Sequence, residues 1–212
     1  MNKKLACFVL SFLTAAGALR PQTVNCLVAL VGGQPVTLLD LEVAREFGFF
    51  DPALEGAAGD PRLAVLEALI GQKAVLGMAR EAVPTGPDDL DLALGALREK
   101  LGPAALAAKL RKFGLGEDDL RPYLEERLRY EKVVSARFSM TIPVSRGEAE
   151  AYYRDVYVPE QRAKGLAPGP LETALPVLEA RIREKARARN VAEWVRAVRD
   201  QAEVRINKDC LK

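Results

Sequence analysis

Apolar residues recur every three or four positions through most of this chain, which is the spacing of amphipathic helices. Clusters of proline and glycine, such as residues 84–87, separate one periodic stretch from the next. Residues 158–170 are also rich in proline and glycine and are expected to form a loop or linker. The pattern predicts helices over about residues 38–47, 63–83, 88–101, 104–113, 117–138, 149–156 and 171–202.

Extended chain is predicted only near the two ends. Residues 24–31 are β-branched and apolar, Gly32-Gly33 can form a tight turn, and extended chain resumes at Pro35-Val36, so a small hairpin is expected. Near the other end, residues 203–207 alternate between polar and apolar side chains, as an edge strand does. The expected fold class is therefore mainly α (α+β), with many helices and a small β element.

Two of the predicted helices begin with a capping signal. Thr37 stands three residues before Asp40, and Ser145 stands three residues before Glu148. In this spacing the hydroxyl and the carboxylate each accept a hydrogen bond from a free backbone N–H of the first turn. Gly48 is expected to end the first helix, because glycine readily adopts the left-handed conformation of a helix terminus.

The first residues have the layout of a secretory signal. Lys3 and Lys4 form a basic start, and an uncharged run of 15 residues follows from Leu5 to Leu19. Ala16 and Ala18 occupy the small-residue positions before cleavage, so residues 1–18 are predicted to be a signal peptide. The run is shorter than the roughly 20 residues that span a bilayer. A retained signal anchor is the alternative; after cleavage, no stable membrane span and an extracytoplasmic location are expected.

Composition removes several classes of function. The chain of 212 residues is 49% hydrophobic and 28% charged, which is typical of a globular protein. It contains no histidine, which excludes Ser-His-Asp and Cys-His nucleophiles and histidine zinc sites. Without Lys3 and Lys4 of the signal, 29 basic residues balance 29 acidic ones, so the mature chain lacks the basic excess of a nucleic-acid-binding protein. We expect no catalytic residue, metal or cofactor and no nucleic-acid partner.

Two cysteines remain once the predicted signal is removed. Cys7 leaves with the signal, and Cys26 and Cys210 lie near opposite ends of the mature chain. An even pair in an oxidising compartment is a disulfide candidate. The cysteine count alone is equally compatible with two unpaired thiols.

Charged clusters have a simple interpretation on helices. The acidic residues of 88–91 and 117–119 fall on predicted first turns, where carboxylates complement the helix dipole. Five basic residues step by two along the last helix and are expected to form a solvated face, with an acidic or lipid-headgroup contact as the alternative. They are Arg181, Arg183, Lys185, Arg187 and Arg189.

Aromatic residues supply the candidate binding surface. Tyr123, Tyr130 and Phe138 fall on one side of the predicted helix 117–138, and Met140 follows its end. Core packing is the simplest interpretation of such a row. The functional alternative is a groove that binds apolar peptide segments, because aromatic and methionine side chains line such grooves. Trp194, the only tryptophan, is expected in the core.

Four stretches of the chain, taken together and in order, resemble the SurA/PpiD/PrsA family of extracytoplasmic chaperones. The first resembles the opening of the family, the second its "FGL…DLRPYLEERL" helix, the third the segment that leads into its isomerase domain, and the fourth its closing helix and strand. They are Val28–Thr37 with Leu39–Glu42, Phe113–Leu115 with Leu120 and Tyr123–Leu128, Val144–Tyr157, and Trp194–Arg196 with Ala202–Ile206.

The resemblance implies a SurA N-domain-like chaperone core that binds unfolded or extended segments of exported proteins, such as outer-membrane proteins. Family members carry a parvulin prolyl isomerase domain where this chain has only residues 158–170, and parvulin histidines are absent, so an isomerase is the less expected outcome. An adaptor that docks one fixed envelope partner is the main alternative, and a separate isomerase is a candidate partner. The implied layout is a signal peptide (1–18), a core (19–157), a linker (158–170) and a closing segment (171–212).

The family pattern also implies that the final strand pairs beside the opening hairpin. That pairing would bring Cys26 and Cys210 close together, and so favours the disulfide over two free thiols.

Overall fold

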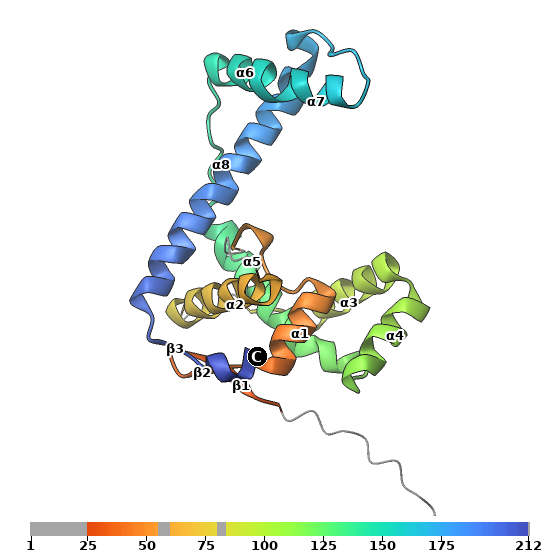
Figure 1. The fold of residues 1–212 in the computed structure, drawn as a ribbon, viewed down its shortest axis with the longest axis vertical. Helices are drawn as coiled ribbons and strands as arrows, with labels where there is room; N and C mark the ends of the chain where they lie inside the picture. Colours follow the sequence, from red (N-terminus) through yellow and green to blue (C-terminus); the bar gives the residue numbers. More distant parts are fainter. Residues whose placement is uncertain (1–24, 55–59, 80–83, 212) are drawn as a thin grey trace, which may run out of the picture.

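The computed structural model describes residues 25–54, 60–79 and 84–211. The predicted signal peptide, with Ala16 and Ala18, lies outside these residues. The fold is mainly helical with a small antiparallel sheet, as predicted (Figure 1). Its elements are β1 (Leu27–Val31), β2 (Gln34–Thr37), α1 (Leu38–Phe47), η1 (Pro52–Leu54), α2 (Pro61–Met78), α3 (Pro87–Leu101), α4 (Pro103–Phe113), η2 (Asp118–Leu120), α5 (Arg121–Arg137), α6 (Arg146–Tyr152), η3 (Tyr153–Tyr157), α7 (Val158–Ala163), α8 (Leu171–Gln201), β3 (Val204–Ile206) and η4 (Lys208–Leu211).

The sheet joins the two ends of the described chain. Its strand order is β2-β1-β3, so β1 is the central strand. Gly32 (φ 54°) and Gly33 (φ 86°) form the tight turn between β1 and β2, where left-handed backbone is required. On the other side of β1, Val31 pairs with Val204 and Ala29 with Ile206. The final strand therefore returns to the opening hairpin, as the family pattern implied.

The capping predictions are confirmed. At the start of α1, Thr37 N–H donates to Asp40 Oδ2 at 2.8 Å and Asp40 N–H donates to Thr37 Oγ1 at 3.2 Å. Ser145 and Glu148 form the same reciprocal pair at the start of α6. Gly48 ends α1 in the left-handed conformation, with φ of 73°.

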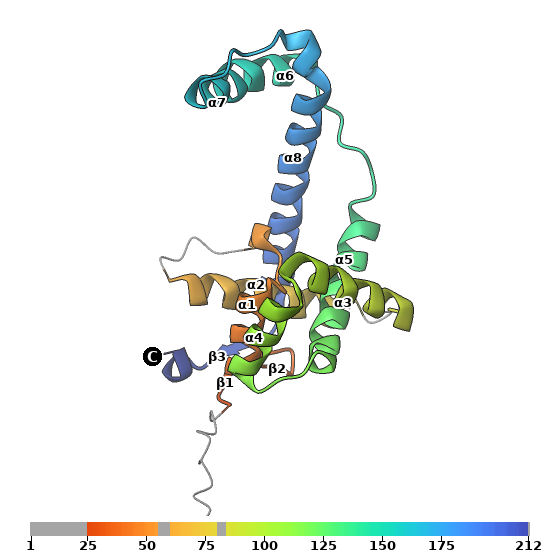
Figure 2. The same cartoon turned by 90° about the vertical axis from the view of Figure 1, so that its right-hand side faces the viewer.

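Helices α1–α5 form a body that lies against the sheet, with α1 and α5 packed on α2 (Figures 1 and 2). Helix α8 packs its lower half on α2 through buried Val191, Val195 and Val198. Gly71 of α2 permits this approach, because a Cβ built there would lie 2.7 Å from Val195 Cγ1. Such a distance is far inside van der Waals contact.

The upper half of α8 carries a second, smaller lobe. Helices α6 and α7, joined by the π-helical turn η3, lie across the upper end of α8 (Figure 2). Ala149 of α6 and Leu178 of α8 are buried in this lobe. Between this lobe and the body, α8 runs beside residues 139–145, which contain no helix or strand. Pro176 lies inside α8, in its second turn, where it lacks the N–H that would donate to the Glu172 carbonyl.

The prediction of a loop over residues 158–170 is wrong for its first part. Helix continues through Ala163 and leaves only 164–170 without helix or strand. Pro159 occupies the first turn of α7, directly after the π-helical turn η3. A wider π turn changes the hydrogen-bonding register, so the helical path continues past a residue that lacks an N–H.

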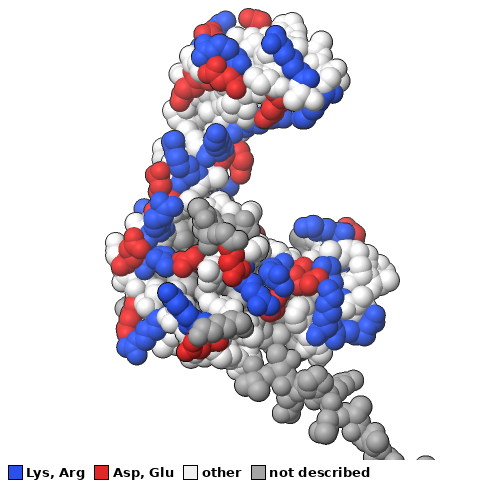
Figure 3. All heavy atoms as spheres, in the orientation of Figure 1, with Lys and Arg blue, Asp and Glu red and all other residues white. Residues whose placement is uncertain are grey.

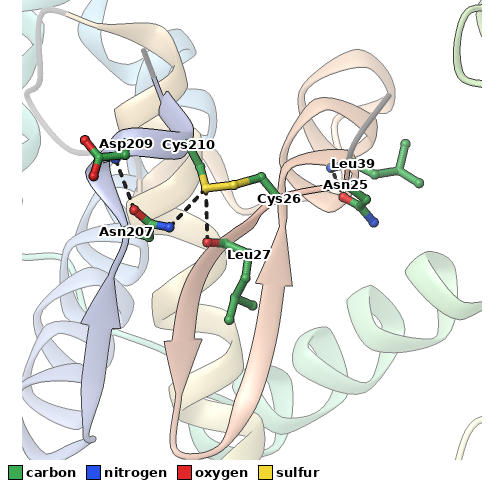
Figure 4. Close-up of a disulfide and its surroundings, with 7 residues drawn as sticks. All are labelled: Asn25, Cys26, Leu27, Leu39, Asn207, Asp209 and Cys210. Atoms are coloured by element: carbon green, nitrogen blue, oxygen red, sulfur yellow. Dashed lines mark hydrogen bonds between the residues drawn. A yellow bond between two sulfur atoms is a disulfide. The ribbon is translucent and has the colours of Figure 1, made fainter. Parts of the chain in front are cut away.

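A disulfide joins Cys26, just before β1, to Cys210 in η4, just after β3 (Figure 4). The Cα atoms are 5.9 Å apart across a sequence separation of 184 residues. Asn207 lies beside the bond, and its Nδ2 is 3.1 Å from Cys210 Sγ. The bond thus reinforces the β1–β3 pairing on the side where both chain ends leave the sheet.

Gly71→Ala should destabilise the fold by about 1–3 kcal/mol, because buried Val195 is stiff at χ1 and cannot move away from the added Cβ. Gly95→Ala on α3 is the matched control, since nothing lies within 4 Å of its added Cβ. It should stabilise by about 0.5–1 kcal/mol through helix propensity. Urea unfolding measures both, and equal effects of the two substitutions would contradict the close α2–α8 packing.

Reduction of the Cys26–Cys210 bond should lower the free energy of unfolding by up to roughly 5 kcal/mol, the chain-entropy value for so long a loop. Urea midpoints with and without dithiothreitol measure the change. The Cys26→Ala/Cys210→Ala variant should unfold at the lower midpoint in both conditions. If the urea midpoint of the unmodified chain is the same with and without dithiothreitol, the disulfide does not stabilise the fold.

Candidate peptide-binding surface

A cavity of about 280 Å³ opens between α1, α2 and α5 on the body. It combines an apolar floor with a charged rim. Ala44, Phe49, Leu69, Pro122 and Tyr123 provide apolar surface. The polar and charged members are Asp40, Gln72, Lys73, Asp119, Glu126 and Arg127.

Tyr123 links the floor to the rim. Its ring lies nearly parallel to that of Phe49, with centroids 6.3 Å apart, and its hydroxyl donates to Asp40 Oδ1 at 3.2 Å. Asp40 caps α1 with its other oxygen, so one carboxylate ties Tyr123 to the start of that helix. Burial, and next the adjacent Asp40 carboxylate, raise the pKa of Tyr123, so the phenol stays neutral at physiological pH.

The charged rim is partly paired. Lys73 Nζ lies 2.9 Å from Glu126 Oε2, and Arg127 Nε donates to Glu131 Oε1 at 2.6 Å. Among the described residues, Nη1 of Arg127 is buried and finds no hydrogen-bond acceptor. A buried donor without a partner is unusual.

The four residues predicted to contact peptide lie in different surroundings. Tyr123 lines the cavity, whereas Tyr130 is only 1% exposed and donates from its hydroxyl to Asp51 Oδ2 at 3.1 Å. Phe138 packs edge-on against Trp194, with centroids 5.6 Å apart. Met140 is 86% exposed in the segment that follows α5. Tyr130 therefore cannot touch a peptide in this structure, and the four side chains do not form one continuous surface.

Trp194 sits where α5 meets α8. It was predicted in the core, but its ring is only partly buried and packs against the core, and the guanidinium of Arg137 lies 4.8 Å from the ring centroid. A cation over an indole face is a favourable contact. Phe138 and Trp194 thus fasten the end of α5 to α8.

The sequence pattern did not indicate the other residues that line the cavity. Phe49 follows α1, Lys73 lies on α2 and Arg127 on α5, and only packing brings the three together. A second cavity of about 300 Å³ lies between the β1–β2 turn, α2 and the end of α8. Met78 lines it and is 50% exposed, which adds apolar surface on another side of the body.

The acidic clusters serve as caps and ion pairs. Asp89 Oδ2 accepts from Gly86 N–H at 3.2 Å and from Lys132 Nζ at 2.7 Å, and these hydrogen bonds lower its pKa. Asp91 pairs with Arg121 at 2.7 Å. Asp119 accepts from Gly116 N–H at 2.7 Å. Within the described ranges, no cluster of acidic and cysteine side chains has the arrangement of a metal site.

Tyr130→Phe should change how stability falls at high pH. Burial, and next the Asp51 carboxylate, raise the pKa of Tyr130 above the unfolded value of about 10. The stability that the neutral phenol contributes is therefore complete below about pH 10 and is lost as the pH rises further. The variant should lose about 1 kcal/mol at pH 8 with the hydrogen bond to Asp51, but its urea midpoint should then fall less steeply up to about pH 11.

Tyr157→Phe, in the upper lobe, serves as the control and should follow the alkaline loss of the unmodified chain. Lysine deprotonation affects all three proteins alike. If Tyr130→Phe shows the same slope as the unmodified chain, ionisation of Tyr130 is not coupled to unfolding.

Part of the chain is similar to a known protein. No family model matches the chain. It is 30% identical over 116 residues to Chaperone SurA of Bordetella avium (strain 197N). The similarity covers 50% of this chain and 23% of that protein. The disulfide is of a kind that persists in oxidising compartments, and together with this similarity it indicates an extracytoplasmic location. The chain is thus distantly SurA-like over about half of its length.

Proposed function

We propose that this protein acts in the periplasm as a chaperone-like protein that holds unfolded or extended segments of exported proteins, outer-membrane proteins among them. The similarity to Chaperone SurA carries the proposal. The residues 1–18 act as the export signal, cleaved after Ala18, and residues 19–157 with 171–212 form the client-binding unit. No covalent chemistry is part of this function.

The cavity at Tyr123 supports the proposal physically. A holding chaperone needs apolar surface that is open to solvent on a stable scaffold. The half-buried Tyr123 ring supplies such surface, and the Lys73 and Arg127 side chains that also line the cavity can bind backbone carbonyls or carboxylates. Non-directional apolar contact combined with a few polar groups suits clients that differ in sequence.

The isomerase alternative is not favoured by the residues present. In the proposed family pattern a parvulin domain would stand after η3, where this chain has α7 and residues 164–170 before α8 begins. The whole sequence contains no histidine. We therefore assign the holding activity without prolyl isomerisation. Acceleration of proline-limited refolding by the stringently purified protein would overturn that part of the proposal.

In the direct test, a urea-unfolded outer-membrane β-barrel protein is diluted into buffer and its light scattering is recorded. The purified protein should lower the scattering in proportion to its concentration. Tyr123→Ala should be at least about twofold less effective, because it removes aromatic surface from the cavity floor. Tyr157→Ala is the matched aromatic control and should retain full activity. Urea unfolding of each variant verifies that it is folded under assay conditions.

Unchanged scattering at molar excess of the protein would reject general holding activity. In-cell crosslinking then distinguishes the adaptor alternative: a single stoichiometric envelope partner would support an adaptor, whereas many unfolded clients support the chaperone.

A further inference from the structure

Helix α8 exposes an unusually basic surface at its middle. Residues 181–189 contain five basic residues and one acid, Glu184, a local net charge of +4. This stretch is the waist of the molecule, where α8 runs between the upper lobe and the body. Figure 3 shows Lys and Arg side chains along this narrow part. The small net charge of the whole chain, +2, hides this concentration.

Four of the basic residues of α8 fall on one face. At about 100° per residue, Lys185, Arg189 and Arg196 lie within roughly 40° of one another, and Arg181 extends the row upward. Lys185, Arg189 and Arg196 are exposed. We call these four residues the basic stripe. It spans 16 residues of helix, from Arg181 to Arg196, or about 22 Å.

The stripe lies between the two regions of α8 that pack on the upper lobe and on the body. Buried Leu178 contacts the upper lobe on the side of α8 where the stripe lies, one level higher. The residues that pack on the body, Val191, Val195 and Val198, point roughly 100° or more away from Arg196. The stripe therefore begins at the edge of the lobe, where Arg181 pairs with Glu160 of α7, and its other members, Lys185, Arg189 and Arg196, are exposed below it.

Nearby acids neutralise the stripe only in part. Arg181 pairs with Glu160 of α7 at 2.9 Å. Arg189 lies 4.0 Å from Glu193, and the side chains of Arg189 and Glu193 are each more than 60% exposed. Pairs as exposed as Arg189–Glu193 contribute little. Lys185 and Arg196 form no ion pair in the described part of the chain. Residues 139–145, which run beside the waist, contain no acid.

The shape of the waist selects the kind of partner. The lobe and the body are both wider than the waist between them (Figures 2 and 3). A flat bilayer would meet these wider ends before it reached the stripe, whereas an extended chain can lie along it. About seven extended residues match the 22 Å of the stripe at 3.3 Å per residue.

We propose that the basic stripe of α8 binds acidic, extended segments of polypeptide. Arg181, Lys185, Arg189 and Arg196 supply the positive charge, and the alternating carboxylates of the bound segment supply the negative charge. The inference deepens the proposed function, because it names an electrostatic preference among clients and a second contact area apart from the Tyr123 cavity. The stripe would accelerate capture by long-range attraction, and the cavity would retain apolar residues.

The test measures fluorescence anisotropy of a labelled peptide of about eight residues that alternates glutamate with serine. The peptide should bind the purified protein, and binding should weaken as salt rises. A peptide with glutamine in place of glutamate should not bind. Lys185→Gln/Arg189→Gln should raise the Kd at least about fivefold, because two of the exposed charges are lost.

Lys100→Gln/Arg111→Gln is the matched control. Both residues are exposed on α3 and α4, and neither forms an ion pair within the described ranges, so the charge change is the same but far from α8. The control should bind the glutamate peptide like the unmodified chain. Equal weakening in both double variants, or equal binding of the two peptides, would overturn the proposal.

Vesicles of phosphatidylglycerol and phosphatidylcholine test the other source of negative charge. If they bind the protein through Lys185 and Arg189 and the peptide does not, the stripe is a membrane contact and the proposal is wrong. The scattering assay separates this inference from the proposed function. With a client that has no acidic segment, Lys185→Gln/Arg189→Gln should protect as well as the unmodified chain even if the peptide result is negative.

Discussion

The pairing of β3 with β1 is the contact on which the rest of the architecture depends. It places the end of α8 against the body, because only two residues separate Gln201 from Val204. It also completes the hydrogen bonding of β1, which would otherwise leave one edge unpaired beside buried Val28 and Val31. The Cys26–Cys210 disulfide closes the same junction covalently. A long-range contact of this kind is costly in chain entropy, and the disulfide reduces that cost by restricting the unfolded chain.

Helix α8 transmits this anchoring to the upper lobe. Its lower half packs tightly on α2, where Gly71 and Val195 meet, and its upper half carries α6 and α7. The contact of Phe138 and Arg137 with Trp194 fixes the other connection, at the end of α5. The lobe is thus held at a distance from the body by one helix whose lower half is anchored through buried Val191, Val195 and Val198. The exposed middle of that helix can carry charge without disturbing either core.

Two kinds of surface result from this arrangement. The cavity at Tyr123 offers aromatic rings with a partly paired charged rim, and the waist offers positive charge on a rigid helix. Apolar contact is short-ranged and tolerant of sequence, whereas charge attraction acts over about a Debye length and selects by sign. Neither surface requires a reactive side chain. Both fit the chaperone-like role that we propose.

Local sequence determined the elements of this fold. Helical spacing, the Thr37–Asp40 and Ser145–Glu148 caps and the Gly32-Gly33 turn all act within a few residues, so they can be recognised without knowledge of the partners. The loop predicted from residue 158 was wrong in part because the sequence pattern does not reveal a π turn, which allows helix to continue at Pro159. Local rules assume the ordinary α-helical register.

Tertiary packing alone decided which side chains remained exposed to solvent or to a binding partner. Tyr123 and Tyr130 are seven residues apart on one helix face, yet one lines a cavity and the other is buried against Asp51. The sequence also showed the basic residues of α8. It did not show that the body and the upper lobe pack on other parts of the helix and leave the basic stripe exposed. Burial depends on the elements that approach from elsewhere in the chain. Periodicity therefore identifies a face, and only the assembled fold shows whether that face meets protein or solvent.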